Sequence, residues 1–169
     1  MLKKLTWIKN FSYSFVLLSL VWLGLTSTFN WQELLVGLTI SFFLSIVISS
    51  GYARLGLPPL GLKRLIYFLI YVLVLAREIV KANFDVAYRA IHPDVPISPG
   101  IVIINTDLEQ DIAKVILANS ITLTPGTFTL DIVGEKLLVH WINVESESEE
   151  EATKIIGERF EKYLEVIFA

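Results

Sequence analysis

The chain has 169 residues, of which 54% are hydrophobic and 18% charged, with a net charge of −3 and no cysteine. The lack of cysteine excludes disulfides, thiolate zinc sites, cysteine-ligated iron–sulfur clusters and haem attachment through cysteine, and no basic patch indicates nucleic-acid binding. The apolar fraction is high for a soluble domain, and the apolar residues crowd between Phe11 and Val80, which predicts membrane segments.

The first apolar run follows the basic start Lys3-Lys4 and extends from Leu5 or Phe11 to Thr26. A signal peptide begins in the same way. No small-x-small cleavage site ends this run, however, and a second apolar segment follows at once. We therefore predict a retained membrane helix with tryptophans near its ends, where interfacial aromatic residues lie.

A second membrane helix is predicted over residues 34–49. Gly37, Ser41 and Ser45 recur at four-residue spacing, and such small residues let neighbouring helices approach closely. Ordinary membrane-helix composition explains the same spacing equally well. The glycines and prolines of residues 51–61 then end the helix.

A third helix is predicted from Leu62 to about Ile91. Its apolar part, residues 65–76, is shorter than the roughly 20 residues that a spanning helix needs. The helical pattern continues beyond it through charged residues. A long helix that spans the membrane and then projects from it fits this pattern.

Charged side chains recur on this third helix at spacings of three and four, at Glu78, Lys81, Asp85 and Arg89. These four residues therefore share one helix face. Such a ladder usually consists of interfacial salt bridges that end a membrane span. A carboxylate at membrane depth also marks ion routes, so Glu78, Lys81 and Asp85 are the candidate ion-path or interface residues.

The orientation in the membrane stays open at this point. Basic residues gather at the N-terminus, in the second loop and after the third apolar run, whereas residues 27–33 carry none. The positive-inside rule then puts residues 27–33 outside. Three spans would leave the last basic cluster outside as well. Two spans, with the third segment at the interface, would keep every basic cluster inside, and a three-span chain with its C-terminus inside needs the N-terminal lysines outside.

Residues 92–100, HPDVPISPG, form a linker that no helix crosses. It separates a transmembrane helical region (residues 1–91) from a small domain (residues 101–169). In that domain residues 101–104 predict a strand, and Thr106-x-x-Glu109 is a capping-box pattern. The helix that it opens carries apolar residues and one asparagine on one side, namely Ile112, Val115, Ile116 and Asn119.

A hairpin and a last helix complete the domain. Phe128, Leu130 and Ile132 alternate with other residues and are the expected core positions of the first hairpin strand. Residues 133–136 form the turn, and Thr124–Thr127 is expected to be a structural turn before the hairpin. Ser148-x-x-Glu151 is a second capping-box pattern. The apolar face of the last helix comprises Ile156, Phe160, Tyr163, Leu164 and Ile167.

The predicted architecture is a membrane α-helical N-terminal half of about three helices, followed by a small α+β domain of order β-α-β-β-α. One helix layer on one face of a mainly antiparallel sheet is the economical packing for that order. No nucleotide-binding glycine loop, GxSxG, HExxH or EF-hand motif occurs. We therefore predict no catalytic residue, no cofactor and no metal site, with His92 at a helix end and His140 as a structural strand residue.

Three segments resemble the E-type subunit of Mrp-type (Mnh) sodium/proton antiporters: REIVKANFDVAYRAI, the PGIV that starts the domain, and SITLTPGTFTLDI with the following VHWINV. The same module is found in archaeal energy-converting hydrogenases and related membrane-bound oxidoreductases. The likeness covers nearly the whole chain by layout.

The resemblance implies a non-catalytic accessory subunit with three spans and a cytoplasmic C-terminal domain in the cell membrane. Its partners would be the lipid bilayer and the other subunits of a complex that exchanges sodium ions for protons, free-standing or coupled to a redox module. The N-terminal lysines depart from that topology. A stand-alone membrane-anchored sensory or ligand-binding protein is the alternative, although the sequence shows no convergent polar pocket.

Overall fold

The computed structural model describes residues 2–54, 58, 61–146 and 148–169. Gly56 and Pro59, which belong to the predicted break after the second helix, lie outside the described residues. Contacts divide the chain into two compact units, Met1–Leu65 and Ile66–Ala169.

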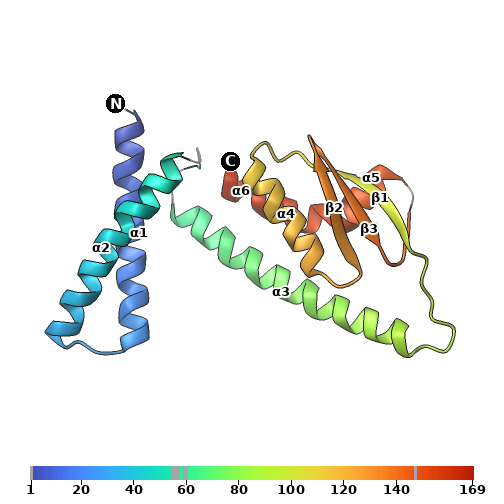
Figure 1. Cartoon of the computed structure of the whole chain (residues 1–169), viewed down its shortest axis with the longest axis horizontal. Coiled ribbons are helices and arrows are strands. Elements are labelled where there is room, and N and C mark those ends of the chain that lie inside the picture. Colours follow the sequence, from blue (N-terminus) through green and yellow to red (C-terminus); the bar gives the residue numbers. More distant parts are fainter. Residues whose placement is uncertain (1, 55–57, 59–60, 147) are drawn as a thin grey trace. The chain divides into compact units, whose positions relative to one another are not determined.

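The first unit is a pair of helices, α1 (Leu2–Thr26) and α2 (Trp31–Arg54), which pack against each other (Figure 1). Both contain a stretch that is long and apolar enough to cross a membrane, Trp7–Thr26 and Trp31–Gly51. The two predicted helices are therefore present, and each extends beyond the apolar run that predicted it.

The small residues of α2 form a packing surface, as their spacing predicts. Ser41 and Ser45 are 2% and 0% exposed. A Cβ atom at Gly37 would lie 2.2 Å from the Trp22 ring of α1, so only glycine allows the indole to lie this close. Beside this packing surface, the Phe42 ring packs edge-on against the Phe11 ring, with the ring centroids 5.5 Å apart.

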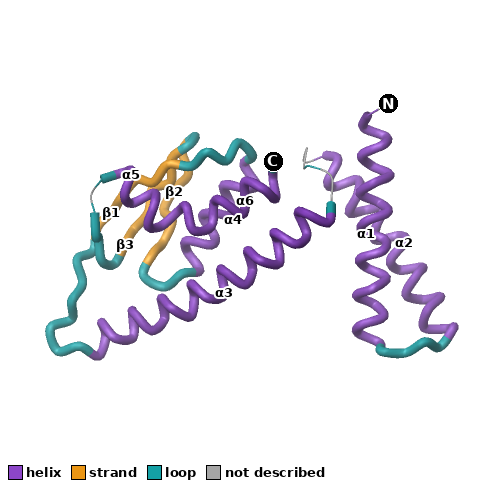
Figure 2. Tube along the Cα trace, turned by 180° about the vertical axis from the view of Figure 1, so that it is seen from behind, coloured by secondary structure: helices purple, strands orange, loops and turns teal. Residues whose placement is uncertain are grey.

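Helix α3 (Leu62–Ile91) has the predicted bounds and runs alongside the α/β elements of the second unit (Figures 1 and 2). It is not among the helices that are long and apolar enough to span a membrane. Tyr71 belongs to the buried core of the second unit, and Leu75 packs against that core. Part of the predicted third membrane segment is thus covered by the α/β elements.

The rest of the second unit has the predicted β-α-β-β-α order and a wholly antiparallel sheet of strand order β1-β3-β2. The elements after α3 are β1 (Gly100–Asn105), α4 (Asp111–Leu123), β2 (Thr127–Val133), β3 (Lys136–Trp141), α5 (Glu149–Ala152), a π-helical turn (Thr153–Gly157) and α6 (Glu158–Phe168). The Thr153 hydroxyl in the π-helical turn accepts a hydrogen bond from the Asn105 backbone N–H at 2.9 Å, which ties the last helical segment to the end of β1.

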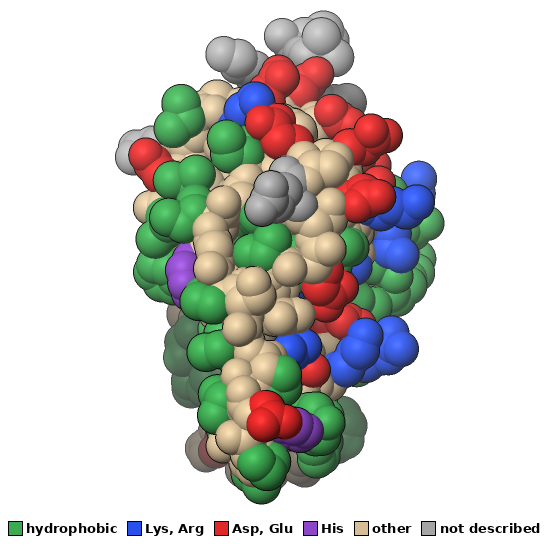
Figure 3. Space-filling model, turned by 90° about the vertical axis from the view of Figure 1, so that its right-hand side faces the viewer, with side chains coloured by type: hydrophobic (Ala, Val, Ile, Leu, Met, Phe, Trp, Pro, Cys, Tyr) green, Lys and Arg blue, Asp and Glu red, His purple; other side chains and the backbone are tan. Residues whose placement is uncertain are grey.

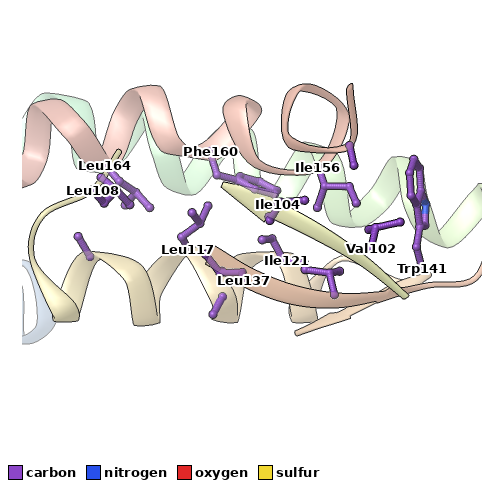
Figure 4. Close-up of a cluster of buried hydrophobic side chains, with 14 of the residues drawn as sticks. Val102, Ile104, Leu108, Leu117, Ile121, Leu137, Trp141, Ile156, Phe160 and Leu164 are labelled. Carbon is purple, nitrogen blue, oxygen red and sulfur yellow. The ribbon is translucent and has the colours of Figure 1, made fainter. Parts of the chain in front are cut away.

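The core lies between one face of the sheet and the helices α4 and α6 (Figure 4). Ile156, Phe160 and Leu164 are at most 1% exposed, which confirms the predicted apolar face of the last helix. They meet buried strand residues and buried α4 residues, namely Ile104, Leu137, Val139, Leu117 and Ile121.

The predicted core face of the hairpin is wrong. Phe128 and Leu130 are 51% and 45% exposed, whereas Leu137 and Val139 are fully buried. Both faces of this hairpin carry apolar residues, so alternation alone does not show which face is covered. A β-bulge between Thr129 and Asp131 also shifts the register, and only beyond it does β2 place Ile132 against the core.

The side of α4 that carries Ile112, Val115, Ile116 and Asn119 is not its most buried side. Val115 is 48% exposed and Asn119 is exposed, whereas Ala113, Ala118 and Ile121 are buried. The alanines have short side chains, so this side of α4 approaches its neighbours closely. Ile112 and Ile116 lie at the edge of the contact and are only partly buried.

Neither capping box forms as predicted. Helix α4 begins at Asp111, and the Thr106 hydroxyl instead donates a hydrogen bond to Glu161 Oε1 at 2.5 Å. The same carboxylate oxygen accepts the Asp107 backbone N–H at 2.6 Å. Ser148 does occupy the N-cap position of α5, but its side chain makes no capping hydrogen bond.

These burial differences predict unequal effects of two phenylalanine truncations. Phe160→Ala empties a fully buried site and is expected to lower the free energy of unfolding by about 3–5 kcal/mol. Phe128→Ala removes a half-exposed ring and is expected to cost less than about 1 kcal/mol. Denaturant unfolding of the purified chain in detergent measures both changes. Equal losses in the free energy of unfolding would show that Phe128 is a core residue.

Candidate functional site

The predicted site residues of α3 line a cleft of about 420 Å³ within the second unit. Its α3 wall carries Glu78, Lys81, Asp85 and Arg89, so the predicted common face is confirmed. The opposite wall consists of the turn before β2, the end of β3 and the last helical segment, with Thr124, Pro125, Gly126, Thr127, Trp141, Asn143, Glu145, Ile155 and Arg159.

Glu78 is the most buried charged residue of the cleft, at 7% exposure. Its Oε2 atom accepts a hydrogen bond from Arg159 Nη1 of α6 at 3.2 Å, and its Oε1 atom accepts one from Arg77 Nη1 at 3.3 Å. Burial lowers the pKa of the Arg159 guanidinium, while the charge and hydrogen bond of Glu78 act in the opposite direction. A carboxylate this buried is stabilised only by such a partner.

A second ion pair lies farther along α3. Arg89 Nε donates to Asp85 Oδ2 at 2.8 Å, and Arg89 Nη1 donates to the Pro96 carbonyl oxygen at 2.7 Å. Arg89 therefore fixes the linker to the end of the helix. Its partner Asp85 has a half-exposed side chain, so this pair contributes less to stability than a buried one.

The turn before β2 is a structural turn, as predicted. The Thr124 hydroxyl donates to the Ser120 carbonyl oxygen at 2.8 Å, and the Thr127 hydroxyl donates to the Ile121 carbonyl oxygen at 2.7 Å. Gly126 has a φ of +93°, and a Cβ atom there would lie 3.1 Å from Ile142. Glycine is therefore required both for the backbone conformation and for the close packing.

Sequence reasoning missed two contacts that fasten α3 to the α/β elements. The Tyr71 hydroxyl hydrogen bonds to the Ser120 hydroxyl of α4, and both residues are buried. Arg159 is the second residue missed. A signal existed in each case, because Tyr71 is a hydrogen-bonding residue within an apolar run and Arg159 stands beside Phe160 on the buried side of its helix.

The arrangement is a set of hydrogen bonds and ion pairs that hold one face of α3. Tyr71 and Glu78 are seven positions apart, about 10 Å along the helix, and each contacts a different helix of the domain. The structure brings Glu78, Lys81 and Asp85 together in one cleft. Two of the three are engaged in ion pairs.

Fold and site together describe a chain with two apolar helices that are long enough to cross a membrane, and with a small α/β unit packed on an amphipathic helix. A family model described as "Na+/H+ ion antiporter subunit" (MNHE) matches residues 15–167. The chain belongs to this family.

Curated relatives agree with the family assignment. The chain is 30% identical over 148 residues to the Na(+)/H(+) antiporter subunit E1 of Staphylococcus saprophyticus, covering 87% of this chain and 89% of the relative. It is 28% identical over 147 residues to subunit E1 of Staphylococcus epidermidis, covering 87% and 90% of the two chains.

A solved structure extends the likeness to three dimensions. A chain in the membrane-bound sulfane sulfur reductase, an archaeal respiratory membrane complex, is 43% identical, with a TM-score of 0.76. The match covers 95% of this chain and 99% of that chain. The relatives are thus subunits of multisubunit membrane complexes.

The part-buried ion pair between Glu78 and Arg159 predicts strong coupling between its two members. Glu78→Gln leaves Arg159 without its carboxylate, and Arg159→Met leaves Glu78 with only the exposed Arg77 as a partner. Each change is expected to lower the free energy of unfolding by about 3 kcal/mol. The double variant is expected to lose clearly less than the sum of the two single losses.

Denaturant unfolding of the full chain in detergent measures this cycle. Asp85→Asn is the matched control on the same face, and its exposed pair predicts a loss below about 1 kcal/mol. Additive losses for Glu78 and Arg159 would show that the pair does not couple α3 to α6.

Proposed function

We propose that the chain is a non-catalytic accessory subunit of a multisubunit sodium/proton antiporter module. The observation that carries this proposal is the family match over residues 15–167. The fold supports this proposal, because the side chains of the candidate site take part in packing and ion pairing. The role is to scaffold the complex, with the α/β unit on the cytoplasmic side of the cell membrane.

Two settings fit this function, a free-standing antiporter and an antiporter module within a redox-coupled membrane complex. Identity is higher to the chain of the archaeal respiratory complex, 43%, than to the staphylococcal antiporter subunit, 30%. This difference favours the redox-coupled setting. The antiporter module would then handle sodium ions and protons while other subunits carry the redox chemistry.

The uncovered face of the sheet supports contact with other subunits. The helices cover one face, and the other exposes Ile101, Phe128 and Leu130 at 60%, 51% and 45%. Val133 near the hairpin turn is 68% exposed. A cluster of exposed apolar side chains on a small domain typically marks a protein contact.

Charge on the rest of the α/β surface is mainly acidic. Acidic side chains crowd the upper part of the face in Figure 3, and the segment that leads into α5 contains the acidic run ESESEEE. A charged surface of one sign beside an apolar face steers the approach of partners with the opposite sign.

We propose that Glu78, Lys81 and Asp85 act at the interface between α3 and the domain rather than on an ion path. Glu78 already has Arg159 and Arg77 as partners. We therefore expect Glu78→Gln to lower the amount of assembled complex, with sodium/proton exchange per assembled complex unchanged. Blue-native gels and exchange in inverted vesicles measure the two quantities. Normal assembly with lost exchange would instead assign Glu78 to the ion path.

Co-purification tests the proposed function itself. A tagged full chain, extracted from its native membrane in mild detergent, is expected to bring down the other membrane subunits in fixed stoichiometry. Deletion of the chain is expected to abolish sodium-dependent proton movement in vesicles, and restoring it should recover that movement. A folded chain that runs alone, with exchange unaffected by its deletion, would favour a stand-alone sensory protein.

A further inference from the structure

Helix α3 has two unlike faces along its whole length. One face carries Arg64, Tyr67, Tyr71, Glu78, Asp85 and Arg89 at helical spacing. The opposite face is an apolar stripe that comprises Leu62, Ile66, Leu69, Leu73, Val80, Phe84, Tyr88 and Ile91. Its members are between 46% and 83% exposed, and Arg77 is the one charged residue that interrupts it.

The α/β elements contact the polar face of α3, and these contacts begin inside the apolar part of the helix. Tyr71 bonds to Ser120 and Glu78 bonds to Arg159. Tyr71 lies nine residues after Leu62, about 14 Å along the helix. In a spanning helix that begins at Leu62, Tyr71 would stand close to the middle of a hydrocarbon core that is about 30 Å thick.

A spanning α3 would therefore draw the α/β elements into the lipid. Helix α4 bears Lys114 six residues before Ser120, and α6 bears Glu158 and Lys162 beside Arg159. Charged side chains are costly in hydrocarbon, and an open sheet edge cannot be satisfied there. The contacts of Tyr71 and Glu78 are thus incompatible with a helix that crosses the bilayer.

The apolar stripe nevertheless fits a lipid surface. Only seven residues separate α3 from α2, a helix able to span the membrane. Helix α3 contains five basic and two acidic residues, a net charge of +3, in a chain of net charge −3. Amphipathic helices of this kind lie in the plane of membranes that contain anionic lipids, where long basic side chains reach the headgroups.

We propose that α3 lies in the membrane–water interface with its apolar stripe in the lipid, and that the chain crosses the membrane twice rather than three times. Helix α3 then lies between the lipid and the α/β elements. This arrangement does not depend on which ions the complex moves.

A chain with two spans also has one orientation in the membrane that agrees with the positive-inside rule. The N-terminal lysines, the basic residues near the start of α3, and Arg77, Lys81 and Arg89 then lie on one side of the membrane, as the positive-inside rule requires. The loop between α1 and α2, residues 27–30, lies on the other side and carries no basic residue.

Depth measurements along α3 test the proposal in the assembled complex. The chain has no cysteine, so Leu69→Cys, Leu73→Cys, Val80→Cys and Phe84→Cys each accept one fluorophore. The complexes are placed in vesicles whose lipids carry a nitroxide quencher near the headgroup or deep in the acyl chain. We expect quenching at all four positions to be about twofold stronger with the shallow quencher.

Two other outcomes would overturn the proposal. Deep quenching that peaks near Leu73 and fades toward Phe84 would show a spanning helix. No quenching by either lipid would show that another protein covers the stripe. Leu20→Cys in α1 serves as the deeply quenched control, and Lys114→Cys in α4 as the unquenched one.

Labelling with a membrane-impermeant maleimide supplies an independent readout. Thr28→Cys, in the loop between α1 and α2, and Ser148→Cys, before α5, are expected to react from opposite sides of the membrane. Reaction from the same side would mean that α3 crosses the bilayer and would refute the two-span chain. Neither measurement uses transport activity, so a failure of the antiporter proposal would be distinguishable from a failure of this one.

Discussion

The second unit depends on the contact between one face of α3 and the α/β elements. Its main ionic contact is the Glu78–Arg159 pair, because Glu78 is only 7% exposed and a buried carboxylate without a partner is strongly destabilising. The buried hydrogen bond between Tyr71 and Ser120 fixes a second point on the same face. Together they set the rotation of α3 about its axis. The opposite face of α3 is apolar and exposed, and the contact with the α/β elements does not account for this exposure.

The α/β elements gain a needed part of their core from α3. A unit of roughly 70 residues buries too little apolar surface to be more than marginally stable. Tyr71 and Leu75 extend its core from outside the sheet and helices. The cleft beside them is lined by charges that pair across it, which suits a scaffold that holds elements in place.

Local patterns predicted much of this fold. The bounds of α3, the order of elements along the chain and the apolar face of the last helix follow from turn residues and helical spacing. The covered face of the hairpin could not be predicted, because both faces are apolar and the bulge at Thr129–Asp131 reverses them. The hydrogen bond that Thr106 makes in place of a helix cap could not be predicted either, because its partner Glu161 lies 55 positions away along the chain. The candidate residues on α3 were found from their spacing, whereas the roles of Arg159 and Ser120 depend on their tertiary contacts with α3.

The packing of α3 against α4 is tested most directly by the proximity of the two helices in the native membrane. A chain that carries Tyr71→Cys and Ser120→Cys is treated with a short bifunctional thiol reagent in intact membranes, and Leu73→Cys with Ser120→Cys is the matched pair from the opposite face of α3. We expect an efficient intramolecular cross-link for the first pair and little for the second. Equal cross-linking of both pairs, or none for the first, would show that α3 does not pack against α4 through Tyr71.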